Sequence, residues 1–349
     1  MNLKLLKKPL WSIALLICLG YFLGFQNTAS GQDLQFSQFH NAPLYLNPAF
    51  AGMHQGGRMT LNYRNQWPSL DVNYVTYSGA FDYYFPNIRS SIGVIAKVDE
   101  QSTGITPYKS TDVSFIYAYM IPLSDRLTIQ PALQVGYVQK SAGFVGLTFP
   151  DQFSDRGFLG TPTEESFARN QLGYVDISTG AVLFGQNFWL GLSANHINSP
   201  PDSFIGDNNR LPMKISFHGG YKIDFANRYD TRNKSITPSF MYKKQGSFQQ
   251  FSLGVNGEYE PLLYGLWYRG FPIEQSTNNF PKHDAMVAML GVKFGGWALA
   301  YSYDWSISEV AGAKANSHEI SLVFNFGGQD DVNCPNPFSE SRYRGARYR

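Results

Sequence analysis

Apolar and polar residues alternate with a period of two through most of this 349-residue chain. Between Val113 and Ile121 every second residue is apolar, and the stretches 127–137, 297–305 and 320–326 largely repeat the pattern. This period indicates β-strands with one apolar face. About fourteen segments of roughly nine to thirteen residues follow it, close to the length with which a tilted strand crosses a bilayer. The chain is therefore predicted to be all-β, as a transmembrane antiparallel β-barrel of about 14 strands.

The composition agrees with a membrane barrel better than with a soluble domain or a helical bundle. Charged residues make up 15% of the chain, against roughly 25% in soluble domains. Aromatic residues make up 16%, yet the mean hydropathy is only −0.25. A barrel combines these values because only every second residue of a strand meets lipid. At a strand spacing of ~4.8 Å and a tilt of ~40°, the backbone of the barrel would be on the order of 25 to 30 Å in diameter, which leaves a lumen too wide for the wall side chains to fill. We expect it to hold water, a plug or a partner.

The lengths of the connections predict the orientation of the barrel. An even number of strands leaves both ends of the sheet on one side, and short turns are typical of the periplasmic side. Connections 226–234 and 244–247 depart from the alternation of short and long. We predict that both termini are periplasmic. The short connections are 86–87, 122–125, 185–187, 260–261 and 295–296, and the long ones are 140–171, 198–211, 270–283 and 306–316.

Four segments are expected along the chain. Residues 1–31 resemble a secretory signal peptide, with three lysines, an apolar stretch and small residues before Gln32. An uncleaved anchor helix is the alternative, although the apolar stretch is short of the ~20 residues that a spanning helix needs. Residues 32–57 form an irregular N-terminal arm, residues 58–326 the barrel, and residues 327–349 a polar, basic tail.

Charge, cysteine content and motifs exclude several functional classes. Without residues 1–31 the chain has 25 basic and 26 acidic residues, so nothing in its charge points to nucleic acid. Only Cys334 then remains, so no internal disulfide is expected. The six histidines have no metal-ligand spacing, and neither a phosphate-binding glycine loop nor a Gly-x-Ser-x-Gly motif is present. We expect no enzyme activity, cofactor or metal.

The arm between residues 32 and 57 is apolar but contains Pro43 and Pro48, from which we predict that its first part is not regular structure. Its exposed aromatic residues need cover. One interpretation is that the arm is a plug, or a lining of the lower (periplasmic) rim, that reaches into the lumen from the periplasmic side. The other is a partner site that uses Tyr45, Asn47 and Pro48, although Asn-Pro is also a common turn starter.

Four charged residues are predicted to face the lumen near the outer ends of their strands: Arg64, Arg269, Asp304 and Glu319. Because the first strand closes against the last, we expect Arg64 to approach Glu319. Pairing of charges inside a wet lumen is one interpretation. The other is a partner-binding ring that selects a peptide through charge-assisted hydrogen bonds.

The tail ends in four arginines without an acidic residue: Arg342, Arg344, Arg347 and Arg349. A run of like charges at a chain end is usually solvated. The alternative is that these arginines bind an acidic periplasmic subunit.

Several motifs resemble those of the PorP/SprF family of outer-membrane proteins, which belong to the type IX secretion and gliding apparatus. The opening motifs carry most of the likeness, and between residues 72 and 261 only the strand pattern matches. The motifs are QFSQ at 35–38, APLYLNPAFAG at 42–52, YRNQW at 63–67, GLWYR at 265–269, SYD at 302–304 and SHEISL at 317–322.

The resemblance implies a non-enzymatic outer-membrane protein that acts in secretion and gliding motility. Family members serve as machine components that contact periplasmic subunits, or as dedicated partners of secreted surface adhesins, whose C-terminal domain is recognised. The expected partners are therefore outer-membrane lipid, an adhesin C-terminal domain and periplasmic type IX components. A porin-like channel or a transporter for hydrophobic solutes is the alternative from a different class.

Overall fold

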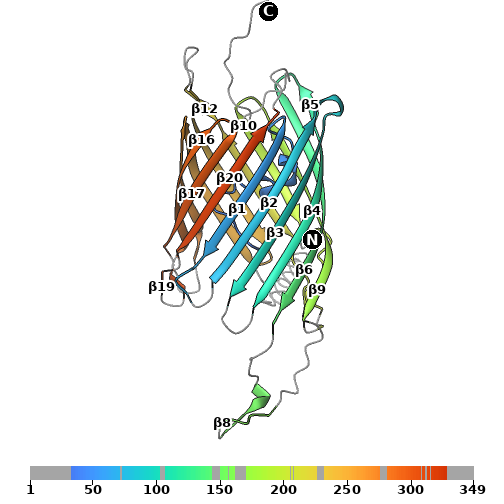
Figure 1. Cartoon of the computed structure of the whole chain (residues 1–349), viewed down its shortest axis with the longest axis vertical. Coiled ribbons are helices and arrows are strands. Elements are labelled where there is room, and N and C mark those ends of the chain that lie inside the picture. Colours follow the sequence, from blue (N-terminus) through green and yellow to red (C-terminus); the bar gives the residue numbers. More distant parts are fainter. Residues whose placement is uncertain are drawn as a thin grey trace, which may run out of the picture. The chain divides into compact units, whose positions relative to one another are not determined.

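The computed structural model describes residues 33–70, 73–102, 107–143, 150–155, 157–161, 170–204, 206, 208–225, 232–275, 281–307, 309–310, 313–314 and 316–327. In the described part, a closed barrel of 14 antiparallel strands encloses the arm, and neighbouring barrel strands follow one another along the chain (Figure 1). The prediction of an all-β barrel of about 14 strands is confirmed. The barrel strands are β1 (Gly57–Gln66), β2 (Asn73–Phe85), β3 (Ser90–Ser102), β4 (Tyr108–Tyr119), β6 (Leu127–Ala142), β9 (Gln171–Phe184), β10 (Phe188–Asn195), β11 (Lys214–Tyr221), β13 (Lys234–Gln245), β14 (Phe248–Tyr259), β15 (Leu262–Gln275), β16 (Pro281–Phe294), β17 (Trp297–Ser306) and β20 (Ser317–Phe326).

Two pairings close the cylinder. Strand β1 pairs with β20 in a register that sets Gly57 against Phe326, and β11 pairs with β13. Short additional strands lie outside the 14: β5 (Ile121–Ser124) pairs with β6 and β12 (Ile223–Asp224) with β13, whereas β7 (Phe153–Ser154) pairs with β8 (Gly157–Phe158) and β18 (Glu309–Val310) with β19 (Ala313–Lys314).

The two rims differ in their connections. We call the rim where β1 begins and β20 ends the terminal rim, and the opposite one the loop rim. All five predicted short connections lie at the terminal rim, which is uppermost in Figure 1, and the long connections 142–171 and 195–214 lie at the loop rim. The loop expected at 270–283 is shorter than predicted, because β15 continues to Gln275 and β16 begins at Pro281, with register shifts in their pairing. The chain termini lie outside the described residues, so their periplasmic placement stays a prediction.

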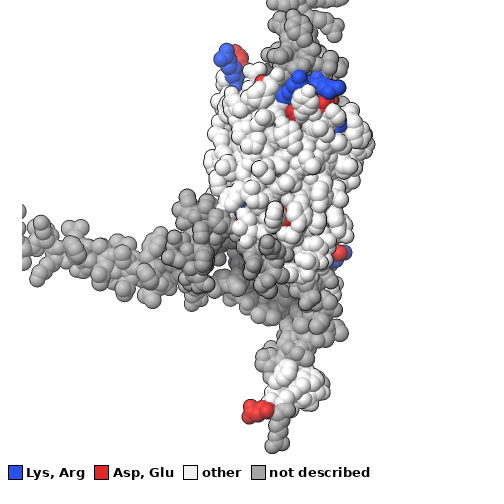
Figure 2. Space-filling model, turned by 90° about the vertical axis from the view of Figure 1, so that its left-hand side faces the viewer, with Lys and Arg blue, Asp and Glu red and all other residues white. Residues whose placement is uncertain are grey.

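The outer face of the wall is apolar, as the alternation predicted. Val113, Phe115, Tyr117 and Tyr119 all point outward on β4. Figure 2 shows a wall that is almost free of charged side chains on the visible face, with most of the Lys, Arg, Asp and Glu residues that it shows gathered at the upper end. This surface matches the apolar band with which a barrel meets lipid.

The inner face of the barrel is not uniformly polar. Inward-facing residues of β3, β4, β6 and β9 include Ile95, Ile116, Ala132, Val182 and Phe184, all buried. They are apolar because the arm lies against them inside the barrel. The arm contributes Phe39, Leu44, Leu46, Ala49, Phe50, Ala51 and Met53 to this core.

The arm contains two short helices, so the prediction that it is not regular structure is wrong for residues 43–50. Helix α2 spans Pro43–Leu46 and the 3-10 helix η1 spans Pro48–Phe50. Each begins with its proline, a position where the missing N–H would have no helical partner and the fixed φ suits the helix. The prolines therefore start these turns instead of preventing them.

Candidate functional site

The arm runs through the lumen from the loop rim to the terminal rim. At its start, Asp33 contacts Lys214 and Gln245, which lie at the loop-rim ends of β11 and β13. At its end, Gly57 opens β1 at the terminal rim. The arm was expected to enter from below as a plug or rim lining, or to present a partner site. In the described part it lies inside the barrel as a plug that occupies part of the lumen, and its first residue lies at the loop rim.

The four predicted lumen charges meet at one residue of the arm, Ser37. Its hydroxyl donates to Asp304 Oδ2 at 2.5 Å. The same oxygen accepts from Arg64 Nη1 at 2.6 Å and from Arg269 Nη1 at 2.8 Å. The cluster draws these side chains from β1, β15 and β17, which are far apart in the sequence. The wall supplies the charged groups of this cluster, and the arm supplies the hydroxyl that joins them.

Glu319 binds the backbone of the arm directly. Its two carboxylate oxygens accept from the N–H of Ser37 at 2.7 Å and of Gln38 at 3.1 Å. Arg64 lies across the seam and pairs with Glu319 at 3.1 Å and with Asp304 at 2.9 Å. The predicted approach of Arg64 to Glu319 is confirmed.

The neighbouring contacts complete the network. Arg269 pairs with Asp304 at 2.9 Å and also with Asp284. Arg64, Asp304 and Glu319 are each no more than 2% exposed, so their charges are compensated within the protein, as buried charges must be. A partner that reached these residues would first have to displace Ser37 and Gln38.

A second polar cluster holds the start of the arm. Asp33 accepts from Lys214 Nζ at 2.6 Å and from Gln245 Nε2 at 3.1 Å, and it pairs with His196 Nε2 at 2.8 Å. The other ring nitrogen of His196 lies 2.8 Å from Asp176. Burial raises the pKa of Asp33, but Lys214 and His196 outweigh it and hold that pKa well below its usual range. Burial lowers the pKa of His196, but Asp33 and Asp176 outweigh it and raise this pKa to about 9.

Of the three predicted arm residues, Asn47 and Pro48 are buried and Tyr45 is partly buried, and they contact the barrel wall or the arm itself. Tyr45 donates from its hydroxyl to Leu34 O, and the ammonium of Lys214 lies 5.0 Å from its ring centroid. Asn47 caps η1 by accepting from Ala49 N at 2.9 Å. Its amide also donates to Leu192 O at 3.1 Å and approaches His218 Nε2 at 3.1 Å. Pro48 is the first residue of η1.

The end of the arm is fixed to the other half of the wall. Asp82 accepts from Gly52 N at 2.7 Å and pairs with Arg58 at 2.9 Å. Arg58 also donates to Phe50 O at 2.9 Å, and Gln130 donates to Ala51 O at 2.6 Å. The arm is thus held at its start, middle and end.

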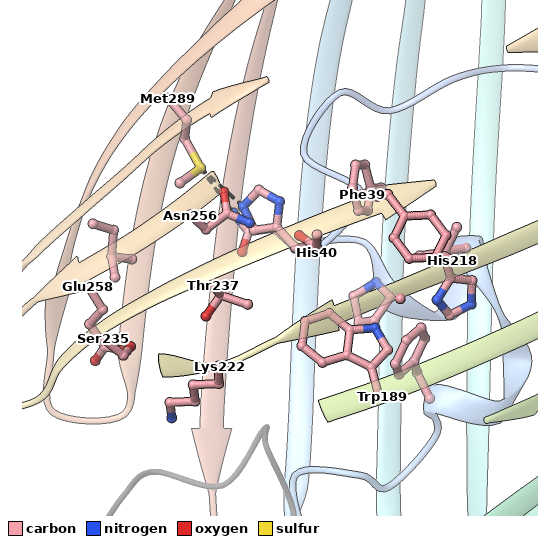
Figure 3. A pocket seen from close by; sticks show the side chains of 18 of the residues that line it. Phe39, His40, Trp189, His218, Lys222, Ser235, Thr237, Asn256, Glu258 and Met289 are labelled. Carbon is pink, nitrogen blue, oxygen red and sulfur yellow. Dashed lines mark hydrogen bonds between the residues drawn. The ribbon is translucent and has the colours of Figure 1, made fainter. Parts of the chain in front are cut away.

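A cavity of about 260 Å³ remains between the arm and the inner face of β10–β16. Figure 3 shows Phe39, His218 and Trp189 on one side of it and Ser235, Thr237 and Glu258 on the other. His40 of the arm approaches Met289 Sδ at 3.1 Å beside the cavity. The plug therefore leaves room in one half of the lumen.

The arm residues that complete the two clusters were not among the predicted site residues. Ser37 and Gln38 lie in the QFSQ motif, which was the available signal, but their contacts with Glu319 and Ser302 join residues more than 260 positions apart. Asp33, His196 and Lys214 form no recognisable sequence motif, because they lie in three segments that are far apart in the chain.

The predicted residues of the C-terminal tail lie beyond the part of the chain that the structure describes. Arg342, Arg344, Arg347, Arg349 and Cys334 lie outside the described residues. Among the described residues, no group of three or more His, Cys, Asp or Glu could hold a metal ion. No described helix is long and apolar enough to span a membrane.

Several solved structures are similar to this chain over most of its length. The CymD monoaromatic hydrocarbon channel is 12% identical with a TM-score of 0.46, over 82% of this chain and 93% of that chain. A FadL homologue of Pseudomonas aeruginosa is 13% identical with a TM-score of 0.45, over 80% and 93%. Omp33 of Acinetobacter baumannii is 9% identical with a TM-score of 0.42, over 78% and 100%. Likeness at this level carries no argument about function.

The family comparison is more specific. No curated protein sequence matches the chain. The family model described as type IX secretion system membrane protein PorP/SprF matches residues 28–324, which include the arm and nearly all of the barrel. The chain belongs to the PorP/SprF family of type IX secretion system membrane proteins.

Proposed function

We propose that this protein is a non-enzymatic partner or anchor for a secreted surface adhesin, and that it also contacts periplasmic components of the type IX machinery. As a family member it is a multi-pass β-barrel of the outer membrane. The adhesin would be recognised through its C-terminal domain, at the loop rim. The periplasmic components would meet the terminal rim, whose short turns suit the periplasmic side.

One observation favours a partner over a porin: the arm occupies the lumen and is held there along its length. Glu319 holds its backbone near the loop rim, and Asp82 holds it near the terminal rim. An open pore would require these buried charges to lose their partners, which is costly in a water-poor interior. The arm therefore supports a closed barrel that works through its surfaces.

The test is affinity purification of the full-length protein from native membranes in mild detergent. We expect an adhesin fragment carrying the C-terminal domain and periplasmic type IX components to copurify. The same preparation should give no large open currents in a planar bilayer. Large currents from protein that brings down neither partner would favour a porin-like channel or a solute transporter and contradict the proposal.

A further inference from the structure

The cavity beside the arm has one wall that offers unused hydrogen-bonding groups. Ser235, Thr237 and Ser239 follow one another at every second position on the inner face of β13. In the part of the chain that the structure describes, none of their hydroxyls has a hydrogen-bond partner. Asn256 pairs with Thr237 across β13 and β14, and its Oδ1 accepts from Trp267 while its amide nitrogen has no described partner.

The opposite wall of the cavity is apolar. Phe39, Leu46 and Phe50 of the arm line it together with Trp189 of β10. Hydroxyl groups that are shielded from bulk water gain from a hydrogen-bond partner. A ligand that suits this cavity would be polar along one edge and apolar along the other.

The cavity reaches the terminal rim. Its lining includes Lys222, which follows the last residue of β11, and Leu263, the second residue of β15. Arm residues 39–41 line it at the other end. A ligand would therefore enter from the terminal rim and stop against the arm.

We propose that this cavity binds an extended peptide segment of a periplasmic type IX component, with a large apolar side chain against Phe39, Phe50 and Trp189. This inference rests on the proposed function. Inward side chains on a strand repeat every ~6.6–6.8 Å, the spacing at which an extended chain repeats its own backbone groups. The row of Ser235, Thr237 and Ser239 can thus bond successive N–H and C=O groups of such a segment.

A lipid headgroup fits the cavity less well, because the described cations near it already have partners. Arg58 is bound to Asp82 at 2.9 Å and Lys293 to Glu258 at 3.0 Å. Lys222 is not free either. A phosphate would have to compete with these carboxylates, whereas a peptide needs only the hydroxyls and the apolar wall.

The first test fills the cavity with a bulky side chain in the full-length protein. Thr237→Trp should reduce the periplasmic components that copurify by at least about tenfold, a loss of about 1.4 kcal/mol of binding free energy. Ile236→Trp, on the outward face of the same strand, should leave them unchanged. Equal copurification with wild type and Thr237→Trp would overturn the cavity site while the proposed function stood.

A second measurement tests the same site without the bulky variant, in case Thr237→Trp does not fold, and it identifies the molecule that occupies the cavity. The photo-crosslinking residue p-benzoylphenylalanine replaces Ser239 in cells, and the adduct is mapped by mass spectrometry. We expect adducts confined to one linear segment of a periplasmic component that contains a large apolar residue. Adducts to phospholipid or lipopolysaccharide, or adducts only to the arm of the same chain, would contradict the proposal. Heat-modifiable gel migration shows that each variant barrel is folded.

Discussion

Glu319 is the residue on which the arm depends most directly, because both of its carboxylate oxygens accept backbone hydrogens of the arm. The pairing of Arg64 with Glu319 could be predicted, since strand alternation and closure of the first strand on the last bring them together. The role of Ser37 could not, because a serine in an apolar stretch has no pattern that assigns it to a distant carboxylate.

Replacing Glu319 with alanine should release the start of the arm. Arg64 loses one of its two acidic partners and two arm N–H groups lose their acceptor, so we expect a loss of about 3–5 kcal/mol in the free energy of unfolding. Urea unfolding in detergent, followed by heat-modifiable migration, measures it.

Glu100→Gln is the matched control for this prediction. It removes an ion pair to Lys109 whose side chains are 44% and 52% exposed, and such pairs contribute only about 0–1 kcal/mol. If both variants lost the same stability, Glu319 would not anchor the arm.

His196 makes the hold on Asp33 dependent on pH. Its pKa is raised from 6.5 to about 9, so its stabilising contribution is complete below pH 6.5 and is lost as the pH rises through about 9. The pKa of Asp33 is lowered below 3.8, so its contribution is present above that pH and is lost in acid. The start of the arm should be held most firmly between these limits.

The comparison of wild type with His196→Asn tests this dependence. The difference between their thermal unfolding midpoints should be largest between pH 4 and 6.5, within the range set by the two pKa values. It should shrink to nothing above about pH 9. A difference that stayed constant from pH 5 to 10 would show that protonated His196 does not hold Asp33.

At the scale of elements, the arm and the wall strands are matched in shape as well as charge. Gly180 of β9 leaves space for the side chain of Asn47, since a Cβ there would lie 2.0 Å from Asn47 Oδ1. Strand alternation predicts that position 180 faces the lumen, but not that a residue 133 positions earlier in the chain fills the space. Packing of an irregular segment against a sheet has no periodic signal.

Gly180→Ala should therefore push Asn47 away from the carbonyls of Ala181 and Leu192. We expect a loss of about 1–3 kcal/mol, typical of overpacking, and faster cleavage of the arm by protease. Gly173→Ala is no suitable control, because a Cβ there meets Tyr137. Ala181→Val, one position along and facing outward, is the better comparison and should leave cleavage unchanged.

At the scale of the whole molecule, the barrel was predictable, whereas the plug was only one of two interpretations of the arm and its contacts could not be predicted. Outward-facing residues such as Val113 and Phe115 are apolar at every second position because they face lipid. The number of strands, the outer face and most connections could therefore be predicted from the sequence. Inward-facing residues do not share one environment. Some pack against the arm, some form ion pairs and some line the cavity, so their polarity follows no single period. Ile116 and Glu319 both face inward for different reasons, and only the three-dimensional course of the arm distinguishes them.

The central claim is that the arm lies inside the barrel, and a disulfide between arm and wall tests it most directly. Cysteines replace Asn47 and Gly180 in a Cys334→Ser background. A Cβ at position 180 would lie 2.9 Å from Asn47 Cγ, whose place the new sulfur takes, and a disulfide can span that separation. We predict that the pair forms a bond in intact membranes, seen as a shift in gel mobility under non-reducing conditions, whereas Asn47→Cys with outward-facing Ala181→Cys does not. A folded barrel in which the Asn47–Gly180 pair stays reduced under mild oxidation would contradict the account.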